Sequence, residues 1–220
     1  MPIARHLSRR ALIGGAAVVA LAAAAAPRLA LATTAPVSAN LTAQDQADLK
    51  RIETYLGNIK TMQTLFEQTN PDGSTAEGEL YLSRPGKLRF EYQPPVPMLI
   101  VSDGNYIAVN DLELKNVQFL PVDRTPAWFL LREAIKLSGD VTVTKFERGP
   151  KSLRVTCVQT KDPDNGAITL VFQDDPLVLK QWTVLDPQHR MTTVALIDPR
   201  QGVDFKPELF YLPNRADNPG

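Results

Sequence analysis

The spacing of apolar residues along the chain changes from a helical period to a period of two near residue 60. Before that point, apolar residues recur every three or four positions, which places them on one face of a helix. They are Leu49, Ile52, Leu56 and Ile59. The segment Thr42-Ala43-Gln44-Asp45 resembles a capping box that starts a helix, and Gly57 weakens its end. We therefore predict an amphipathic helix that lies against an apolar surface.

Alternating apolar and polar residues follow and predict antiparallel strands. The first strands are separated by turn sequences at 70–73, 84–87 and 103–104, and Pro85-Gly86 suits a type II turn. A second series of strands is expected at 141–146, 152–160, 167–173, 177–185 and 191–197. Short strands at this spacing are typical of an all-β sheet or barrel.

The alternation is interrupted between residues 125 and 137. Thr125 is a candidate helix cap, and Pro126 suits the first helical position, so we predict a short helix here. Its large apolar residues are too many for one face: Trp128, Phe129, Leu130, Leu131, Ile135 and Leu137. Such a helix is either packed between two surfaces or covers a cavity.

A long antiparallel sheet with two helices has two ordinary arrangements, a closed barrel or a curved open sheet whose concave face the helices cover. The second helix interrupts the meander of strands, which favours the covered open sheet. We expect one domain from residue 41 to residue 213, followed by a polar tail at 214–220.

The N-terminal 32 residues have the three parts of a cleaved signal peptide. Arginines precede an uncharged run from 11 to 26, which is shorter than the roughly 20 residues needed to span a bilayer. Small residues at 30–32 offer a cleavage site, although cleavage could instead follow Ala39. The sequence at 8–13 also fits a twin-arginine signal, so the export route stays open. We expect a mature protein in the periplasm.

Charge and composition exclude several classes of function. Removing the signal segment, which holds four arginines, leaves 20 basic against 24 acidic residues. A mildly acidic chain has no electrostatic surface for nucleic acid, and no polybasic cluster is present to hold it on anionic lipid. We therefore expect no nucleic-acid partner.

Residues for catalysis or metal binding are sparse. After removal of the signal segment one histidine remains, His189, which cannot easily build a metal cluster or a serine triad. Cys157 shares its parity with apolar strand residues, which indicates a small buried side chain. Four aspartates flank Pro, Asn and Gly and are interpreted as turn residues rather than as a calcium site or a glycosidase pair: Asp162, Asp164, Asp174 and Asp175. We expect no catalytic residue, no metal and no cofactor, and hence no enzyme.

The segment from Gly78 to Gly104 combines an apolar surface with one fixed charge. Arg84 ends a strand in which Leu80 and Leu82 point to the same side. A guanidinium in such a place needs partners, and carbonyls at the end of a covering helix are natural acceptors. The alternative is an ordinary surface arginine before a turn.

This segment resembles the signature of the periplasmic outer-membrane lipoprotein carrier family (LolA type), in which a strand ending in Arg-Pro precedes an aromatic strand and an Asp-Gly turn. The resemblance implies a mainly β (α+β) fold, in which a curved antiparallel sheet forms an unclosed barrel covered by a helical lid over a hydrophobic cavity. It also implies a monomeric carrier that shields the acyl chains of lipoproteins and ferries them from the inner to the outer membrane. Its expected partners are lipoproteins and an inner-membrane lipoprotein-releasing transporter, with an outer-membrane acceptor left open.

The resemblance assigns site residues as well. Arg84 takes the role of the arginine that closes the lid, and the lid helix contributes Trp128, Phe129 and Leu131. The acyl-chain cavity is expected to be lined by Phe66, Leu80, Leu82, Leu88, Phe90, Tyr92, Met98 and Ile100. For each apolar residue the alternative is permanent packing in the core.

The sequence also departs from the family pattern. Tyr81 stands where tryptophan is common, Asn116 stands where glutamine is frequent, and Ile107-Ala108-Val109-Asn110 replaces an aromatic cluster. These changes concern the shape of the cavity more than the fold. A second hypothesis is a periplasmic regulatory module, because related half-barrels sense lipid-like signals and bind a partner protein. Such sensors usually carry a further domain, for which this chain is expected to be too short.

Overall fold

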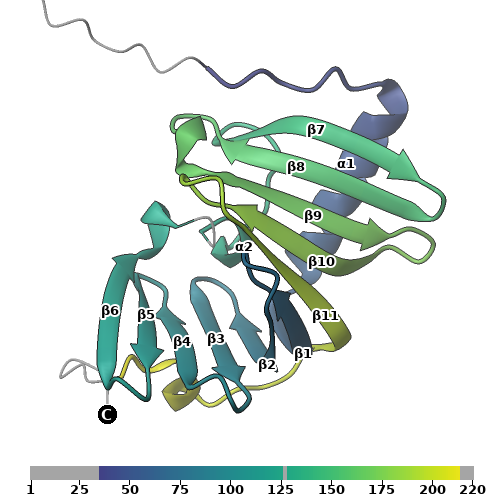
Figure 1. Cartoon of the computed structure of the whole chain (residues 1–220). Coiled ribbons are helices and arrows are strands. Elements are labelled where there is room, and N and C mark those ends of the chain that lie inside the picture. Colours follow the sequence, from purple (N-terminus) through teal and green to yellow (C-terminus); the bar gives the residue numbers. More distant parts are fainter. Residues whose placement is uncertain (1–34, 126–127, 214–220) are drawn as a thin grey trace, which may run out of the picture. The chain divides into compact units, whose positions relative to one another are not determined.

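An eleven-stranded antiparallel sheet dominates the computed structural model, which describes residues 35–125 and 128–213 (Figure 1). The strand order is β6-β5-β4-β3-β2-β1-β11-β10-β9-β8-β7, so β6 and β7 are the two edges and the sheet is unclosed. The strands are β1 (Thr61–Thr69), β2 (Thr75–Ser83), β3 (Lys87–Tyr92), β4 (Met98–Asp103), β5 (Tyr106–Asp111), β6 (Asn116–Pro121), β7 (Val141–Gly149), β8 (Ser152–Gln159), β9 (Ala167–Gln173), β10 (Val178–Leu185) and β11 (Met191–Gln201). The predicted mainly β, unclosed architecture is confirmed.

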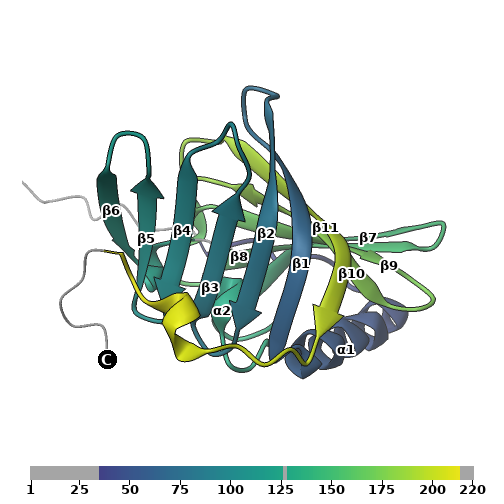
Figure 2. The ribbon, with the colours of Figure 1, turned by 90° about the horizontal axis from the view of Figure 1, so that it is seen from below.

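The sheet curves between its two halves (Figures 1 and 2). Register shifts interrupt the pairing of β1 with β11, of β9 with β10 and of β7 with β8. Such irregularities bend a strand and increase its local twist. They give the sheet a concave face, on which most of the buried apolar side chains lie in one continuous cluster.

Helix α1 (Ala43–Asn58) covers the concave face of the C-terminal strands. Its predicted capping box is present, because Thr42 Oγ1 accepts a bond from Asp45 N at 3.2 Å and Thr42 N donates to Asp45 Oδ2 at 3.0 Å. The expected apolar face of the helix is buried, and its Tyr55 ring packs edge-on against Phe172 of β9. Burial of this face holds the helix on the sheet.

Helix α2 (Trp128–Leu131) is much shorter than the helix predicted from 125 to 137, and that prediction was wrong beyond Leu131. The physical reason is competition for the helix carbonyls. The Leu130 carbonyl accepts from the Arg84 side chain and the Leu131 carbonyl accepts from Gly86 N, so these tertiary donors take the place of the next helical turn. Residues 132–140 contain no helix or strand, yet Ile135 and Leu137 remain buried. The expected first helical position, Pro126, lies outside the described residues.

Strand β6 was not predicted as a strand, and the other strand positions agree with the apolar alternation. Three short 3-10 helices complete the described elements: η1 (Val122–Arg124), η2 (Pro163–Asn165) and η3 (Pro207–Phe210). The segment with η3 runs along the outer face of β3 and β4, where Arg89 Nη1 donates to Leu209 O at 3.1 Å (Figure 2). The expected signal peptide and polar tail lie outside the described residues. Among the described helices, none is long and apolar enough to cross a membrane.

Candidate functional site

An apolar cavity of about 240 Å³ lies on the concave side of the sheet, beside α2. It is lined by Leu88 and Phe90 of β3, Thr125, Leu130 and Leu131, Trp182 and Val184 of β10, and Thr192 and Val194 of β11. Figure 1 places α2 between the two halves of the sheet that contribute these strands. A second hollow of about 20 Å³ shares Leu88, Leu130 and Trp182 with the first and reaches Arg84.

Arg84 follows β2 and directs its side chain into this region. Its Nε donates to Leu130 O at 2.7 Å, and its Nη1 donates to Ile59 O at 3.1 Å and to Leu56 O. Leu56 and Ile59 lie at the end of α1, where carbonyls lack the donors of a further helical turn, although Leu56 O also accepts from Ile59 N at 3.3 Å. Burial lowers the pKa of Arg84 to about 10, which still leaves the guanidinium protonated at neutral pH. One partly buried cation therefore joins the end of β2 to both helices through main-chain oxygens.

The turn that carries Arg84 is fixed by its neighbours. Gly86 has a φ of +81°, as the predicted turn requires, and its N donates to Leu131 O at 2.8 Å. A Cβ on Gly86 would lie 2.5 Å from Gly104 Cα, so the two turns pack backbone to backbone. Ser102, which is fully buried, donates from its hydroxyl to Gly86 O at 2.7 Å. This packing sets the position from which Arg84 reaches the helices.

The residues predicted to line the cavity fall into two groups. Leu88 and Phe90 line the larger hollow, while Leu80 and Leu82 line the smaller one. The other four line neither hollow: Phe66, Tyr92, Met98 and Ile100. Among these, Phe66 is 1% exposed and packs edge-on against the rings of Phe90 and Tyr92, with centroids 4.9 and 5.2 Å apart.

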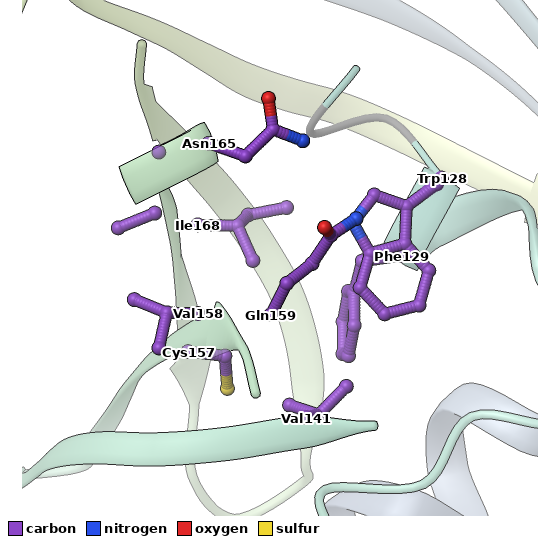
Figure 3. Close-up of a pocket in the computed structure, with 10 residues that line it drawn as sticks. Trp128, Phe129, Val141, Cys157, Val158, Gln159, Asn165 and Ile168 are labelled. Carbon is purple, nitrogen blue, oxygen red and sulfur yellow. The ribbon is translucent and has the colours of Figure 1, made fainter. Parts of the chain in front are cut away.

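The predicted lid residues are also divided. Leu131 lines the larger cavity, whereas Trp128 and Phe129 line a separate hollow of about 20 Å³ (Figure 3). That hollow includes Cys157, which is 1% exposed on β8, as its parity predicted. Burial raises the pKa of the Cys157 thiol to about 12, so it stays protonated near neutral pH. Phe129 is 1% exposed and anchors α2 in the core.

Several lining residues were absent from the predicted site: Thr125, Leu130, Trp182, Val184, Thr192 and Val194. The strand residues among them form two cross-strand pairs, Trp182 with Val194 and Val184 with Thr192. The alternation of residues along each strand is visible in the sequence. Only the pairing of β10 with β11 indicates which set of alternate residues faces α2. No group of side chains suited to a metal ion occurs among residues 35–125 and 128–213.

A family model described as "Outer membrane lipoprotein carrier protein LolA" matches residues 57–213. The chain belongs to the LolA family. A LolA-family relative from Chromohalobacter salexigens, described as outer-membrane lipoprotein carrier protein, is 28% identical over 200 residues, which cover 86% of this chain and 94% of the relative. A protein of the same description from Pseudomonas syringae pv. tomato is 25% identical, with 86% of this chain and 96% of the relative covered.

Solved structures also resemble this LolA-family chain. One is a LolA superfamily protein from Nitrosomonas europaea, with a TM-score of 0.44, 9% identity and coverage of 74% of this chain and 97% of the other. Another is MucB, with a TM-score of 0.41, 14% identity and coverage of 76% and 62%. Scores at this level carry no argument about function.

Proposed function

We propose that this protein is a periplasmic carrier that shields the acyl chains of lipoproteins and takes them from the inner to the outer membrane. The observation that carries the proposal is an apolar cavity beside α2, whose Leu130 carbonyl accepts a hydrogen bond from the partly buried Arg84. Family membership supports the same cargo, because the relatives are described as outer-membrane lipoprotein carriers. In the proposed cycle a transporter in the inner membrane supplies the cargo, and the carrier acts as a monomer.

A carrier must bind acyl chains and also release them. Exposing a chain to water costs about 0.8 kcal/mol per methylene, so a lipoprotein with several chains would not leave its membrane without a shielded site. The lining of the cavity is largely apolar, and its polar side-chain groups are the hydroxyls of Thr125 and Thr192 and the indole N–H of Trp182. Such a surface binds by diffuse contact, without strong directional bonds that would oppose release.

The closed cavity is too small for this cargo. Its volume of about 240 Å³ lies below the roughly 300–1,000 Å³ of ordinary ligand pockets, and lipoprotein acyl groups are larger than most ligands. Loading therefore requires α2 to move away from β3 and β10. The Arg84 bond to Leu130 opposes that movement, and a hydrogen bond to a charged donor contributes about 1.5–3 kcal/mol. In the proposal this bond favours the empty closed state and so promotes release.

The proposal is tested by reconstituting release of a triacylated lipoprotein from membranes. Inner-membrane vesicles that contain the cargo and its transporter are incubated with the protein and then removed by centrifugation. We expect the lipoprotein to appear in the supernatant as a complex with this chain, and a cargo without acyl chains to form no complex. Isolation of the protein with one membrane-anchored regulator and no acylated protein would support the regulatory hypothesis instead.

A further inference from the structure

A groove that is more polar than the hollows described above also adjoins α2. It has a volume of about 700 Å³ and lies between the β2–β3 turn, the β4–β5 turn and the end of α2. It is lined by Pro85, Gly86, Gly104, Asn105, Tyr106, Pro121, Val122, Asp123, Trp128, Leu131, Arg132 and Glu133. The sequence prediction did not include this groove.

The groove adjoins the acyl-chain cavity through a single side chain. Leu131 lines both hollows, so it forms the wall between them. Gly86 and Gly104 line the groove and pack against each other, so at these two positions its lining is main chain only. Any group attached to acyl chains in the cavity meets this groove on passing Leu131.

Arg132 gives the groove an unsatisfied donor. Its Nη2 lies 3.3 Å from Asp140 Oδ2, and its guanidinium lies 5.0 Å from the centroid of the Trp128 ring. Its Nη1 is buried and has no acceptor among the described residues. Leaving a charged donor buried without an acceptor is unfavourable, so a movement of α2 that brings Nη1 to a new acceptor is favoured.

The charges of the groove indicate the class of ligand. Arg132 is accompanied by two exposed carboxylates, Asp123 and Glu133. The negative charges of the two carboxylates repel an anionic headgroup. A peptide backbone, in contrast, offers both carbonyl acceptors for Arg132 and N–H donors for the carboxylates. The mixed lining therefore suits an uncharged, extended peptide better than a phosphate.

We propose that this groove binds the peptide that directly follows the lipidated cysteine of the cargo, with Arg132 donating to a peptide carbonyl once α2 has moved. The inference rests on the proposed carrier function and adds a peptide subsite to it. Acyl chains then lie on one side of Leu131 and the first residues of the cargo polypeptide lie on the other.

Two synthetic probes test this subsite. One is a triacylated cysteine amide, and the other is the same group followed by five uncharged residues. We expect the wild-type protein to bind the peptide-bearing probe about tenfold more tightly, since one charge-assisted bond is gained. Arg132→Gln should abolish this difference, Arg132→Lys should restore part of it, and Arg124→Gln, at an exposed arginine outside the groove lining, should retain it.

The ratio of the two affinities is the decisive quantity, because a change in folding or in the closure of α2 affects both probes alike. Equal affinities in the wild-type protein, or an undiminished ratio in Arg132→Gln, would overturn the peptide subsite while leaving the carrier function intact. If Arg124→Gln also bound the two probes equally, the affinity difference would depend on the net charge of the protein rather than on Arg132, and this too would overturn the subsite. If the wild-type protein bound neither probe, the proposed carrier function would fail first, and this inference with it.

Discussion

Arg84 Nε lies 2.7 Å from the carbonyl oxygen of Leu130, which joins the end of β2 directly to α2. The Nη1 atom of the same side chain donates to two carbonyls at the end of α1. Helix α1 has further anchors, because its buried Asp48 is paired with Arg148 of β7. Helix α2 has only four residues and is followed by a segment without helix or strand. We therefore expect α2, rather than α1, to move when the cavity opens.

Replacing Arg84 should trap the loaded state. In Arg84→Leu the bond to Leu130 is lost, and with it about 1.5–3 kcal/mol that favours closure over opening. We expect uptake of cargo to persist and transfer to acceptor liposomes to slow by about tenfold or more. The measurement is the rate at which a fluorescent triacylated lipoprotein leaves the purified complex.

The matched control for this variant is Arg154→Leu, since Arg154 is an exposed arginine on β8. It should transfer cargo at the wild-type rate. Arg84→Lys should behave like Arg84→Leu, because one ammonium group cannot reach both helices in the geometry of the guanidinium fork. Wild-type transfer by Arg84→Leu would contradict the role of the arginine.

Much of the fold could be predicted from the sequence because its elements are locally determined. The capping box at Thr42 and Asp45 acts within one helical turn, and the strands follow the alternation of apolar residues. Strand β6 lacks that signal, since all of its six residues except Val117 are exposed. It forms because Asp111 Oδ1 accepts bonds from the N atoms of Glu113 and Leu114 and closes the preceding turn.

The site was less predictable because it depends on contacts distant in sequence. The need of Arg84 for carbonyl acceptors could be inferred from its apolar neighbours, but Leu130 lies 46 positions away along the chain. The same bond explains the short α2, whose sequence alone favours a longer helix. No local sequence pattern predicted that Trp182 lines the cavity, because its position there depends on the pairing of β10 with β11.

The contact between Gly86 and Gly104 should make Gly86 intolerant of a side chain. Gly86→Ala combines a left-handed backbone, which costs about 1–2 kcal/mol, with a Cβ placed 2.5 Å from Gly104 Cα. We expect a loss of about 2–4 kcal/mol in the free energy of unfolding, measured by urea denaturation. Gly73→Ala is the control, since Gly73 has a φ of +83° but open space around it. Equal losses in the two variants would show that the close contact is unimportant.

Asp48 should make stability dependent on pH in the acid range. Burial acts to raise its pKa, but hydrogen bonds from Arg148, Arg51 and Gln44 outweigh it, so the pKa of Asp48 is lowered. A lowered folded-state pKa contributes stability that is complete above the ordinary carboxylate pKa of about 4 and is lost as pH falls below it.

The test compares thermal unfolding of the wild-type protein with that of Asp48→Asn between pH 2.5 and pH 7. The variant should be less stable at neutral pH. The difference should shrink as the pH falls below about 4, because Asp48 of the unfolded wild-type chain then takes up a proton, and at still lower pH the folded carboxylate does so too. Asp162→Asn, at an exposed aspartate in a loop, should follow the wild-type curve. A difference that stayed constant over the whole range would mean that the charge of Asp48 does not stabilise the fold.

The two tryptophans should report the cavity and its lid separately. Trp182 lines the larger cavity, whereas Trp128 lines the separate small hollow and the polar groove instead. A brominated fatty acid quenches indole fluorescence on contact. In the Trp128→Phe variant the remaining indole is Trp182, so the fluorescence of this variant should be quenched strongly. In Trp182→Phe the remaining Trp128 should be quenched weakly, and the unbrominated acid should quench neither variant. Strong quenching of Trp128 with little effect on Trp182 would place the acyl chain outside the larger cavity and contradict the proposed site.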